Sequence, residues 1–380
     1  MMKYKALKDI ATITMGQSPD SSSYNEEKNG IPFYQGNADF GELYPTARVW
    51  CSKPQKIAKE NDILISVRAP IGALNYATEE CCIGRGLAAI TIENDFERNY
   101  VFHFLKAQNK ELNNKGTGST FKAISKSVLE EIQVPVISKE QQEISMKLLD
   151  IIEQIIRQRK QELQKLDELI KARFIEMVGE PENNNKAWPV KSLDKLCTVG
   201  SSKRVYQSEQ SSEGVPFWRI SDLVSKIDTG TVDSELFISE IKYTELKRAG
   251  LVPVTGDILV TSRGTLGRCY IVHDEDCFYF QDGMISWLSN YSEEITPLYL
   301  QYLFTMSGFR KQIDNAQAGS TVAYLSIAML KKLQVMVPNK ALQEQFAAFV
   351  EQVDKSKVTI QKALDETQLL FDGLMQKYFG

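Results

Sequence analysis

Residues 139–178 read KEQQEISMKLLDIIEQIIRQRKQELQKLDELIKARFIEMV, with neither proline nor glycine. Apolar residues recur every seven positions along this stretch, at Leu149, Ile156, Leu163, Ile170 and Met177. A heptad repeat on an otherwise charged surface is typical of one long helix that packs against a partner helix. At 1.5 Å of rise per residue, such a helix would be about 60 Å long. We therefore predict a rod that sets the distance between two other parts of the chain.

The same pattern returns in residues 340–379, displaced by 201 positions, so that Leu149 corresponds to Val350. Because neither helix could bury its apolar seam alone, we expect the two seams to pair in antiparallel fashion. The alternative is that each helix packs on its own globular module. Three charged residues interrupt the seams and are candidate contacts with a partner protein, with solvated positions at the edge of the seam as the alternative: Arg159, Arg173 and Lys357.

The repeat extends through the rest of the chain, in three further pairs of matching blocks. They are GSTFKAIS (118–125) with GSTVAYLS (319–326), NDILISVRAPIG (61–72) with GDILVTSRGTLG (256–267), and GIPFY (30–34) with GVPFW (214–218). The second copy carries additional residues between its blocks at 214–218 and 256–267, and insertions of that kind are expected in surface loops. Internal duplication on this scale indicates two similar modules related by a pseudo-twofold axis.

The order along the chain is then module, rod, module, rod. We predict a first module over 1–137, a first helix over 138–179, a second module over 180–338 and a second helix over 339–380. Residues 179–189, GEPENNNKAWP, carry the glycine, proline and asparagine of a hinge. Short β-branched runs alternate with helical patterns inside each module, which indicates a mixed α/β (α+β) fold.

Composition limits the classes of function. The chain has 380 residues, 43% hydrophobic residues and a net charge of −4. No apolar run is long enough to span a membrane, and six cysteines in this length are typical of reduced thiols in the cytoplasm. The charge is unfavourable for binding DNA, unless basic residues gather on one face or a partner supplies phosphate contacts.

The repeated GST-x-x-x-I/L-S and DIL-x-x-x-R-x-x-[IL]-G segments, each copy followed by a long helix, resemble the specificity subunits of type I restriction-modification enzymes. The resemblance covers both halves of the chain in the same order. It implies that each module is a target recognition domain for one half of a bipartite double-stranded DNA sequence. It also implies that the helices space the two halves and dock two methyltransferase subunits, with restriction subunits as further partners. The chain itself would then be non-catalytic, and S-adenosylmethionine, ATP and Mg²⁺ would belong to the partner subunits.

Candidate DNA-binding residues fall into a shared set and a variable set. The glycine-hydroxyl loops suit close approach to a phosphate, although ordinary turns and helix caps use the same residues. Both copies share an arginine and a Ser-Thr pair, which are Arg68, Ser119 and Thr120 in the first module and Arg263, Ser320 and Thr321 in the second. Lys122 and Tyr324 follow the two loops and could reach the DNA backbone or a base edge. A residue common to both modules is poorly placed to read different bases, and an arginine at such a position could equally fix its loop by pairing with a carboxylate.

Base discrimination is expected where the copies differ. Glutamine and asparagine suit adenine, whereas arginine and lysine suit guanine; for any single residue, a solvated surface position is the alternative. The variable candidates are Gln17, Ser18, Gln35, Asn37 and Arg85 in the first module and Lys203, Arg204, Trp218, Arg219 and Gln281 in the second.

Enzymatic functions have little support in the sequence. Asp233, Glu240 and Lys242 fit the loose spacing of a metal-dependent nuclease, but short strings of this kind are common. The chain contains no phosphate-binding GxxxxGK[ST] loop and no methyltransferase motif, and we predict no metal site. A tandem-repeat scaffold that binds protein is the alternative from another class.

Overall fold

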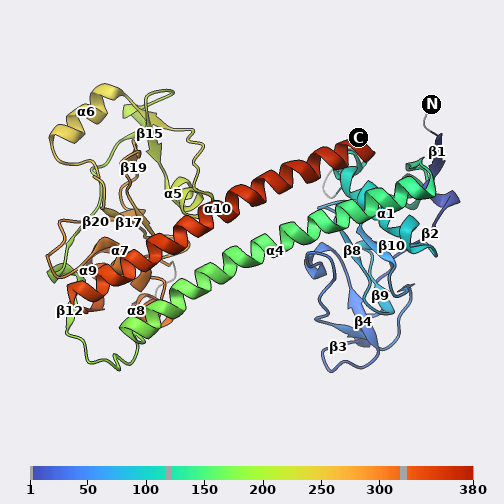
Figure 1. Cartoon of the computed structure of the whole chain (residues 1–380), viewed down its shortest axis with the longest axis horizontal. Helices are drawn as coiled ribbons and strands as arrows, with labels where there is room; N and C mark the ends of the chain where they lie inside the picture. Colours follow the sequence, from blue (N-terminus) through green and yellow to red (C-terminus); the bar gives the residue numbers. More distant parts are fainter. Residues whose placement is uncertain (1–2, 117–121, 317–322, 380) are drawn as a thin grey trace. The chain divides into compact units, whose positions relative to one another are not determined.

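The computed structural model of the chain describes residues 3–116, 122–316 and 323–379 (Figure 1). Its contacts divide the chain into two units, one formed by residues 1–160 with 361–380 and the other by residues 161–360. Each unit therefore contains one module and a half of each long helix. These helices are α4 (Lys139–Val178) and α10 (Lys340–Phe379), and the predicted limits differ from these bounds by one residue at each end.

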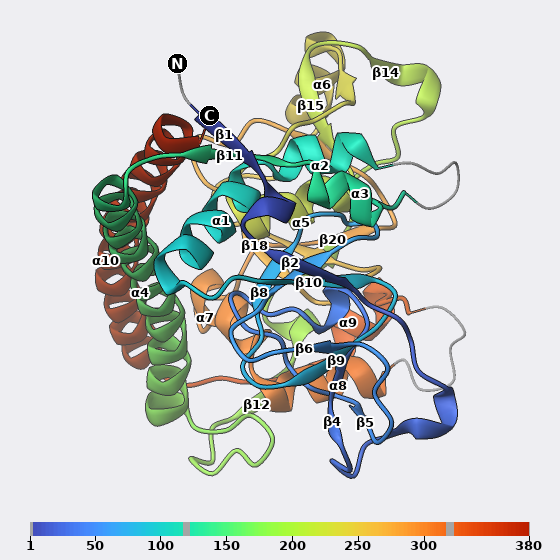
Figure 2. The same cartoon turned by 90° about the vertical axis from the view of Figure 1, so that its right-hand side faces the viewer.

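Among its described residues, unit 1 has three small sheets, and Figure 2 labels β2, β10 and β8 of one of them. The first pairs β1 (Lys3–Ala6) with β11 (Gln133–Val136). The second has the order β2 (Thr12–Met15), β10 (Leu87–Thr91), β7 (Ile63–Ser66), β8 (Leu74–Tyr76). The third has the order β3 (Tyr24–Asn25), β5 (Trp50–Cys51), β4 (Ile31–Tyr34), β9 (Cys81–Ile83), β6 (Ile57–Ala58), and β4 and β9 run parallel.

Unit 2 repeats this topology. β12 (Val190–Ser192) pairs with β21 (Gln334–Met336). The second sheet has the order β13 (Thr198–Gly200), β20 (Ile285–Ser289), β17 (Ile258–Thr261), β18 (Cys269–Ile271). The third has the order β14 (Gln210–Ser211), β16 (Phe237–Ile238), β15 (Val215–Trp218), β19 (Tyr279–Phe280), again with one parallel pair, β15 with β19. The predicted mixed fold with an internal repeat is confirmed.

β5 and β16 take equivalent places in the third sheet of each unit, so most of the additional residues of the second copy lie between β16 and β17. Unit 2 has two helices between β15 and β17, α5 (Ile220–Thr229) and α6 (Glu240–Arg248). Leu223 of α5 is fully buried in a cluster with Leu259 and Phe280. α5 therefore belongs to the core of unit 2, because an amphipathic helix gains stability by burying its apolar side. α6, which lies among the additional residues, is largely exposed and buries Leu246, so the addition is at the surface as expected but forms a helix.

The short helices also correspond between the units. They are α1 (Asp95–Ala107), α2 (Asn109–Lys115) and α3 (Lys126–Glu130) in unit 1, and α7 (Pro297–Leu303), α8 (Ser307–Asn315) and α9 (Ile327–Lys332) in unit 2. Asn94 and Thr296 cap α1 and α7 by accepting a hydrogen bond from a backbone N–H of the first turn. Among the described residues, no helix is both long and apolar enough to cross a membrane.

In unit 2, α4 and α10 pair with each other and also pack on the module. The Phe174 ring of α4 stacks on Tyr299, with centroids 5.5 Å apart, and meets Phe346 of α10 edge-on at 5.3 Å. Lys357 donates to Asp167 across the two helices at 2.7 Å. Positions 167 and 174 of α4 therefore face 357 and 346 of α10, so the helices are antiparallel. Pairing of the two helices and packing of a helix on a module thus occur together.

Two of the three charged side chains that interrupt the seams form contacts within the chain. The guanidinium of Arg173 lies over the ring of Phe349 at 5.7 Å and pairs with Glu176 at 2.7 Å. Lys357 pairs with Asp167, as described above. These two side chains are thus engaged in the helix pair, and their proposed use as partner contacts is not supported.

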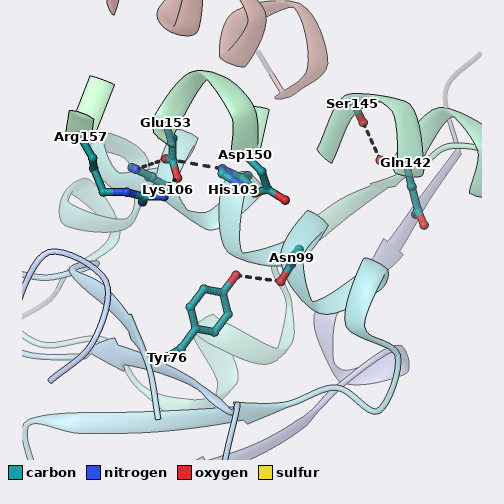
Figure 3. Close-up of polar contacts among 9 residues, drawn as sticks. All are labelled: Tyr76, Asn99, His103, Lys106, Gln142, Ser145, Asp150, Glu153 and Arg157. Carbon is teal, nitrogen blue, oxygen red and sulfur yellow. Dashed lines mark hydrogen bonds and ion pairs between the residues drawn. The ribbon is translucent and has the colours of Figure 1, made fainter. Parts of the chain in front are cut away.

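In unit 1, the first half of α4 is joined to α1 by polar contacts (Figure 3). Lys106 donates to Glu153 at 2.6 Å, and His103, which is buried, lies 3.4 Å from the Asp150 carboxylate through its Nε2. The end of α10 closes the same core, because the Phe379 ring contacts Tyr100 with centroids 5.3 Å apart. Unit 1 is thus completed by the last residues of the chain.

A buried carboxylate precedes the central strand of each module. Asp62 and Asp257 are each 4% exposed, and burial raises the pKa of both carboxyl groups. Asp257 accepts hydrogen bonds from the backbone N–H of Val254 at 2.9 Å and from Nε1 of Trp287 at 2.8 Å. Asp62 accepts the equivalent backbone bond from Lys59 at 2.8 Å. Asp62 and Asp257 thus occupy the same turn in the two copies.

Candidate nucleic-acid interface

In unit 1, the segments that follow β2, β4 and β7 all meet the turn between β9 and β10. The N–H of Gln17 donates to Ile83 at 3.0 Å, and the N–H of Gly84 donates to Tyr34 at 2.8 Å. The N–H of Val67 donates to Gly86 at 2.9 Å. These backbone bonds bring the ends of three strands together at one edge of the module.

Glycines allow the segments of this edge to pack backbone against backbone. A Cβ on Gly16 would lie 2.1 Å from the carbonyl oxygen of Gly84, and one on Gly86 would lie 2.2 Å from that of Gln35. Real Cβ atoms do not approach so closely, so glycine is required at both positions. Five of the predicted residues are gathered here. Gln17, Gln35 and Arg85 are exposed, and Ser18 and Asn37 are partly exposed.

Arg68 lies on the turn after β7, next to the segment that follows the first glycine-hydroxyl loop. The N–H of Ile124 donates to Val67 at 3.0 Å, and the N–H of Ala69 donates to Lys122 at 3.3 Å. On the other side, Nδ2 of Asn113 donates to the carbonyl of Ile71 at 2.7 Å. The residues before and after positions 117–121 are therefore both anchored on the Arg68 turn. Ser119, Thr120, Ser320 and Thr321 lie outside the described residues.

Unit 2 reproduces these contacts at the matching positions. The N–H of Gln281 donates to Trp218 at 2.9 Å, as Gly84 does to Tyr34. The N–H groups of Ser262 and Leu325 repeat the bonds of Val67 and Ile124, donating to Met284 and Ser262 at 2.9 Å each. Nη1 of Arg310 donates to Leu266 at 2.6 Å, in the place of the asparagine contact of unit 1. The edge is thus a common backbone frame, with exposed Arg68 and Arg263 at equivalent points.

The side chains carried by the frame differ between the two units. Arg85 of unit 1 forms no ion pair among the described residues, and its side chain is exposed. At the matching turn of unit 2 stands Asp282, whose Oδ2 accepts a hydrogen bond from Nε of Arg204 at 2.8 Å. This hydrogen bond raises the pKa of Arg204. The N–H of the neighbouring Lys203 donates to the Tyr279 hydroxyl at 2.9 Å, which fixes the backbone beside Arg204.

Two predicted residues take other roles. Trp218 is 5% exposed, and its ring stacks on Phe278 with centroids 3.7 Å apart and planes 2° from parallel. It is a core residue beneath the edge, so its assignment as a DNA contact is wrong for this structure. Arg219 is partly buried and its Nη2 donates to Glu235 at 3.2 Å, so its guanidinium is already engaged.

The remaining candidates stay at the edge. The Arg263 guanidinium lies 5.3 Å above the ring of Tyr324, which is partly exposed. Such a contact orients an arginine without neutralising its charge. Lys122 is exposed, and Gln281 is partly exposed next to Asp282.

The constellation considered for a nuclease does not assemble. Nζ of Lys242 donates to Glu209 at 2.5 Å, and the ion pair raises the pKa of the lysine and lowers that of the glutamate. The lysine is thus paired away from Asp233 and Glu240. Within the described ranges, no cluster of three or more His, Cys, Asp or Glu side chains could hold a metal ion.

Sequence reasoning missed the residues that build the frame. Gly84 and Gly86 flank Arg85 in the sequence, and a Gly-Arg-Gly turn after a buried strand was an available signal. Asp282 had no such signal, because its partner Arg204 is 78 positions away.

Comparison with known proteins identifies the class of these paired modules. The sequence profile described as the type I restriction modification DNA specificity domain matches residues 1–165 and again residues 185–367. The chain therefore belongs to this family, with two such domains, and it is a DNA-recognising specificity subunit of the type I restriction-modification class.

Individual relatives agree with this assignment. The chain is 43% identical over 156 residues to a Methanocaldococcus jannaschii chain named "Putative type I restriction enzyme MjaX specificity subunit", a match that spans 41% of this chain and 37% of that relative. It is 22% identical over 409 residues to the MjaIX specificity subunit of the same organism, which covers 98% of this chain and 91% of the relative. The crystal structure of a type I S subunit from M. genitalium has the same fold, with a TM-score of 0.58, 16% identity and coverage of 100% and 96%.

Proposed function

We propose that each unit reads one half of a bipartite double-stranded DNA target through the edge where its strands end. One observation carries this proposal: the two units build the same backbone frame from matching hydrogen bonds and present different side chains on it. A common backbone frame that carries different side chains suits two half-sites of different sequence, since phosphate contacts position a protein and base contacts specify the target.

The shared arginines and the variable tips then have different tasks. Arg68 and Arg263 occupy equivalent points and would contact phosphates, together with Lys122 and the glycine-hydroxyl loops. The variable side chains of the edge would read bases, with Gln17 and Gln35 suited to adenine.

We further propose that two methyltransferase subunits dock along α4 and α10 and modify adenines in the bound DNA. The exposed apolar residues Ile144, Leu148 and Ile151 follow one side of α4, with exposed fractions of 60%, 37% and 55%, and Leu369 of α10 is 72% exposed. A row of exposed apolar residues at i, i+4 and i+7 on one side of a helix suits docking against a partner protein. Partners that close around the duplex would share the phosphate contacts, which accounts for the net charge of −4.

In this scheme the chain performs no chemistry. S-adenosylmethionine would be bound by the methyltransferase subunits, and ATP and Mg²⁺ by restriction subunits where these complete the enzyme. The assembly would act in the cytoplasm, where chromosomal DNA is accessible.

The test is to co-express the chain with a candidate methyltransferase partner and to map methylated adenines across the genome. We expect one bipartite motif. Replacing residues 1–137 by the corresponding module of another specificity subunit should change one half of the motif and leave the other half intact. A matched insertion of one helical turn in α4 and α10 should change the unread gap and not the bases. Methylation without a motif, although the partner is bound, would contradict the proposal.

A further inference from the structure

Arg204 is held differently from every other arginine that the structure describes. Its Nε donates to Asp282 at 2.8 Å, whereas Nη1 and Nη2 form no hydrogen bond among the described residues. The side chain is 64% exposed and projects from the segment after β13. By contrast, Arg268 uses both of its Nη atoms on Asp228 and Arg219 uses Nη2 on Glu235.

This arrangement leaves free the end of the guanidinium that recognises guanine. Bidentate reading of the O6 and N7 atoms of guanine needs two parallel N–H donors in one plane. A free arginine must lose rotamer freedom to present them, and this loss weakens binding. The bond from Nε to Asp282 fixes the plane of the guanidinium before DNA arrives, and the Tyr279 hydroxyl fixes the backbone at Lys203.

The alternative is that Arg204 and Asp282 form a surface ion pair that only joins two loops. Exposed pairs of this kind contribute little to stability, and the Asp282 side chain is 22% exposed. However, a contact that only joined two loops would gain nothing from leaving both Nη atoms unused. The pair also lies among the side chains that differ between the two units at the edge where the strands end. At the matching turn of unit 1, Arg85 stands in the place of Asp282 and forms no ion pair among the described residues, so the pair is a difference between the units and not part of the common frame.

We propose that Arg204 reads a guanine in the half-site of unit 2 and that Asp282 is the positioning residue for its guanidinium. This inference rests on the proposed function, because it assumes that the edge of unit 2 faces base edges in the major groove.

The experiment uses the full chain in complex with its co-expressed methyltransferase subunits. The motif methylated by the wild-type complex is first mapped, and duplexes are then made in which each base pair of both half-sites is changed in turn. Competition binding at one salt concentration gives the preference of the wild type and of Arg204→Ala, Arg204→Lys and Asp282→Ala at every position. Arg248→Ala is the matched control, since Arg248 is an exposed arginine of unit 2 at the end of α6.

We expect Arg204→Ala to lose about 5- to 150-fold of discrimination at one G·C pair in one half-site, which corresponds to one bidentate contact. Arg204→Lys keeps the charge but lacks the planar pair of donors, so it should lose preference at the same position. Asp282→Ala should reduce the same preference to a smaller extent, which a role in loop stability alone would not produce. Arg248→Ala should leave all preferences unchanged.

Three results would overturn the inference. One is an equal loss of affinity for every duplex, because that is the behaviour of a phosphate contact. Another is an unchanged preference at every position. The third is a preference retained by Arg204→Lys, which decides the matter if the alanine variant does not fold. A wild-type complex that methylates without any motif would instead refute the proposed function, so the two failures are distinguishable.

Discussion

Replacing Phe174 by alanine tests whether α4 is an integral part of the core of unit 2. The Phe174 side chain is fully buried, stacks on Tyr299 and meets Phe346 edge-on. Removing a buried phenyl ring costs about 3–5 kcal/mol, and the loss of two aromatic contacts favours the upper half of that range. We therefore expect unit 2 to lose about 4–5 kcal/mol of stability.

Hydrogen exchange followed by mass spectrometry localises this effect. Because 1.4 kcal/mol corresponds to a factor of ten, amides in the second half of α4 and in α7 should exchange about a thousandfold faster. Peptides from β7 and β10 of unit 1 should keep their protection. The neighbouring Ile175 is 37% exposed, so Ile175→Ala is the matched control and should change exchange far less. Equal effects of the two variants, or an equal loss of protection in both units, would refute the assignment of this half of α4 to the core of unit 2.

Three other predictions concern the frame, the buried carboxylate and the helix pair. Arg68→Ala and Arg263→Ala should each reduce the slope of log affinity against log salt by about 0.9 without changing the preferred bases; a change of base preference in a binding assay would show direct reading instead. Burial raises the pKa of the Asp257 carboxyl above its ordinary value of 3.8, so its contribution to folding is fully present below that pH and is lost as pH rises through the folded pKa. In urea unfolding across this range, the free energy of unfolding of the wild type should therefore fall relative to that of Asp257→Asn as pH rises. A difference in unfolding free energy that does not change with pH would contradict the raised pKa of Asp257. Lys357→Ala should lower the free energy of unfolding by less than about 1 kcal/mol, because its pairing with Asp167 is solvent-accessible, and a loss of several kcal/mol in the same assay would mean that the pair is structurally essential.

The long helices could be predicted closely because helix formation is a local property. Proline and glycine are missing from residues 139–178, and the heptad positions Leu149 and Ile170 are buried as expected. The repeat likewise matched Arg68 with Arg263, which stand at equivalent points of the two units. Patterns with a short period, or with an internal copy, are visible in a single sequence.

The contacts of individual side chains could not be predicted, because they depend on residues far apart in the chain. An aromatic residue at the end of a strand has the same sequence context whether it is exposed or buried, so Trp218 was misassigned. Lys357 interrupts an apolar seam, but its partner Asp167 is 190 positions away. Arg204 was a candidate for guanine on chemistry alone, and its orientation by Asp282 needed the fold.

The closure of unit 1 by the end of α10 has a consequence for synthesis of the chain. Gln108 donates to the carbonyl of Phe379, 271 positions later, and Phe379 also packs on Tyr100. At ribosomal rates of about 5–20 residues per second, the first module waits on the order of 15 to 50 seconds for the residues that complete its core. A nascent chain released before residue 361 would carry an unfinished first module as well as a truncated helix. Premature termination near the C-terminus should therefore expose the N-terminal module to chaperones and proteases, although every residue of that module has been made.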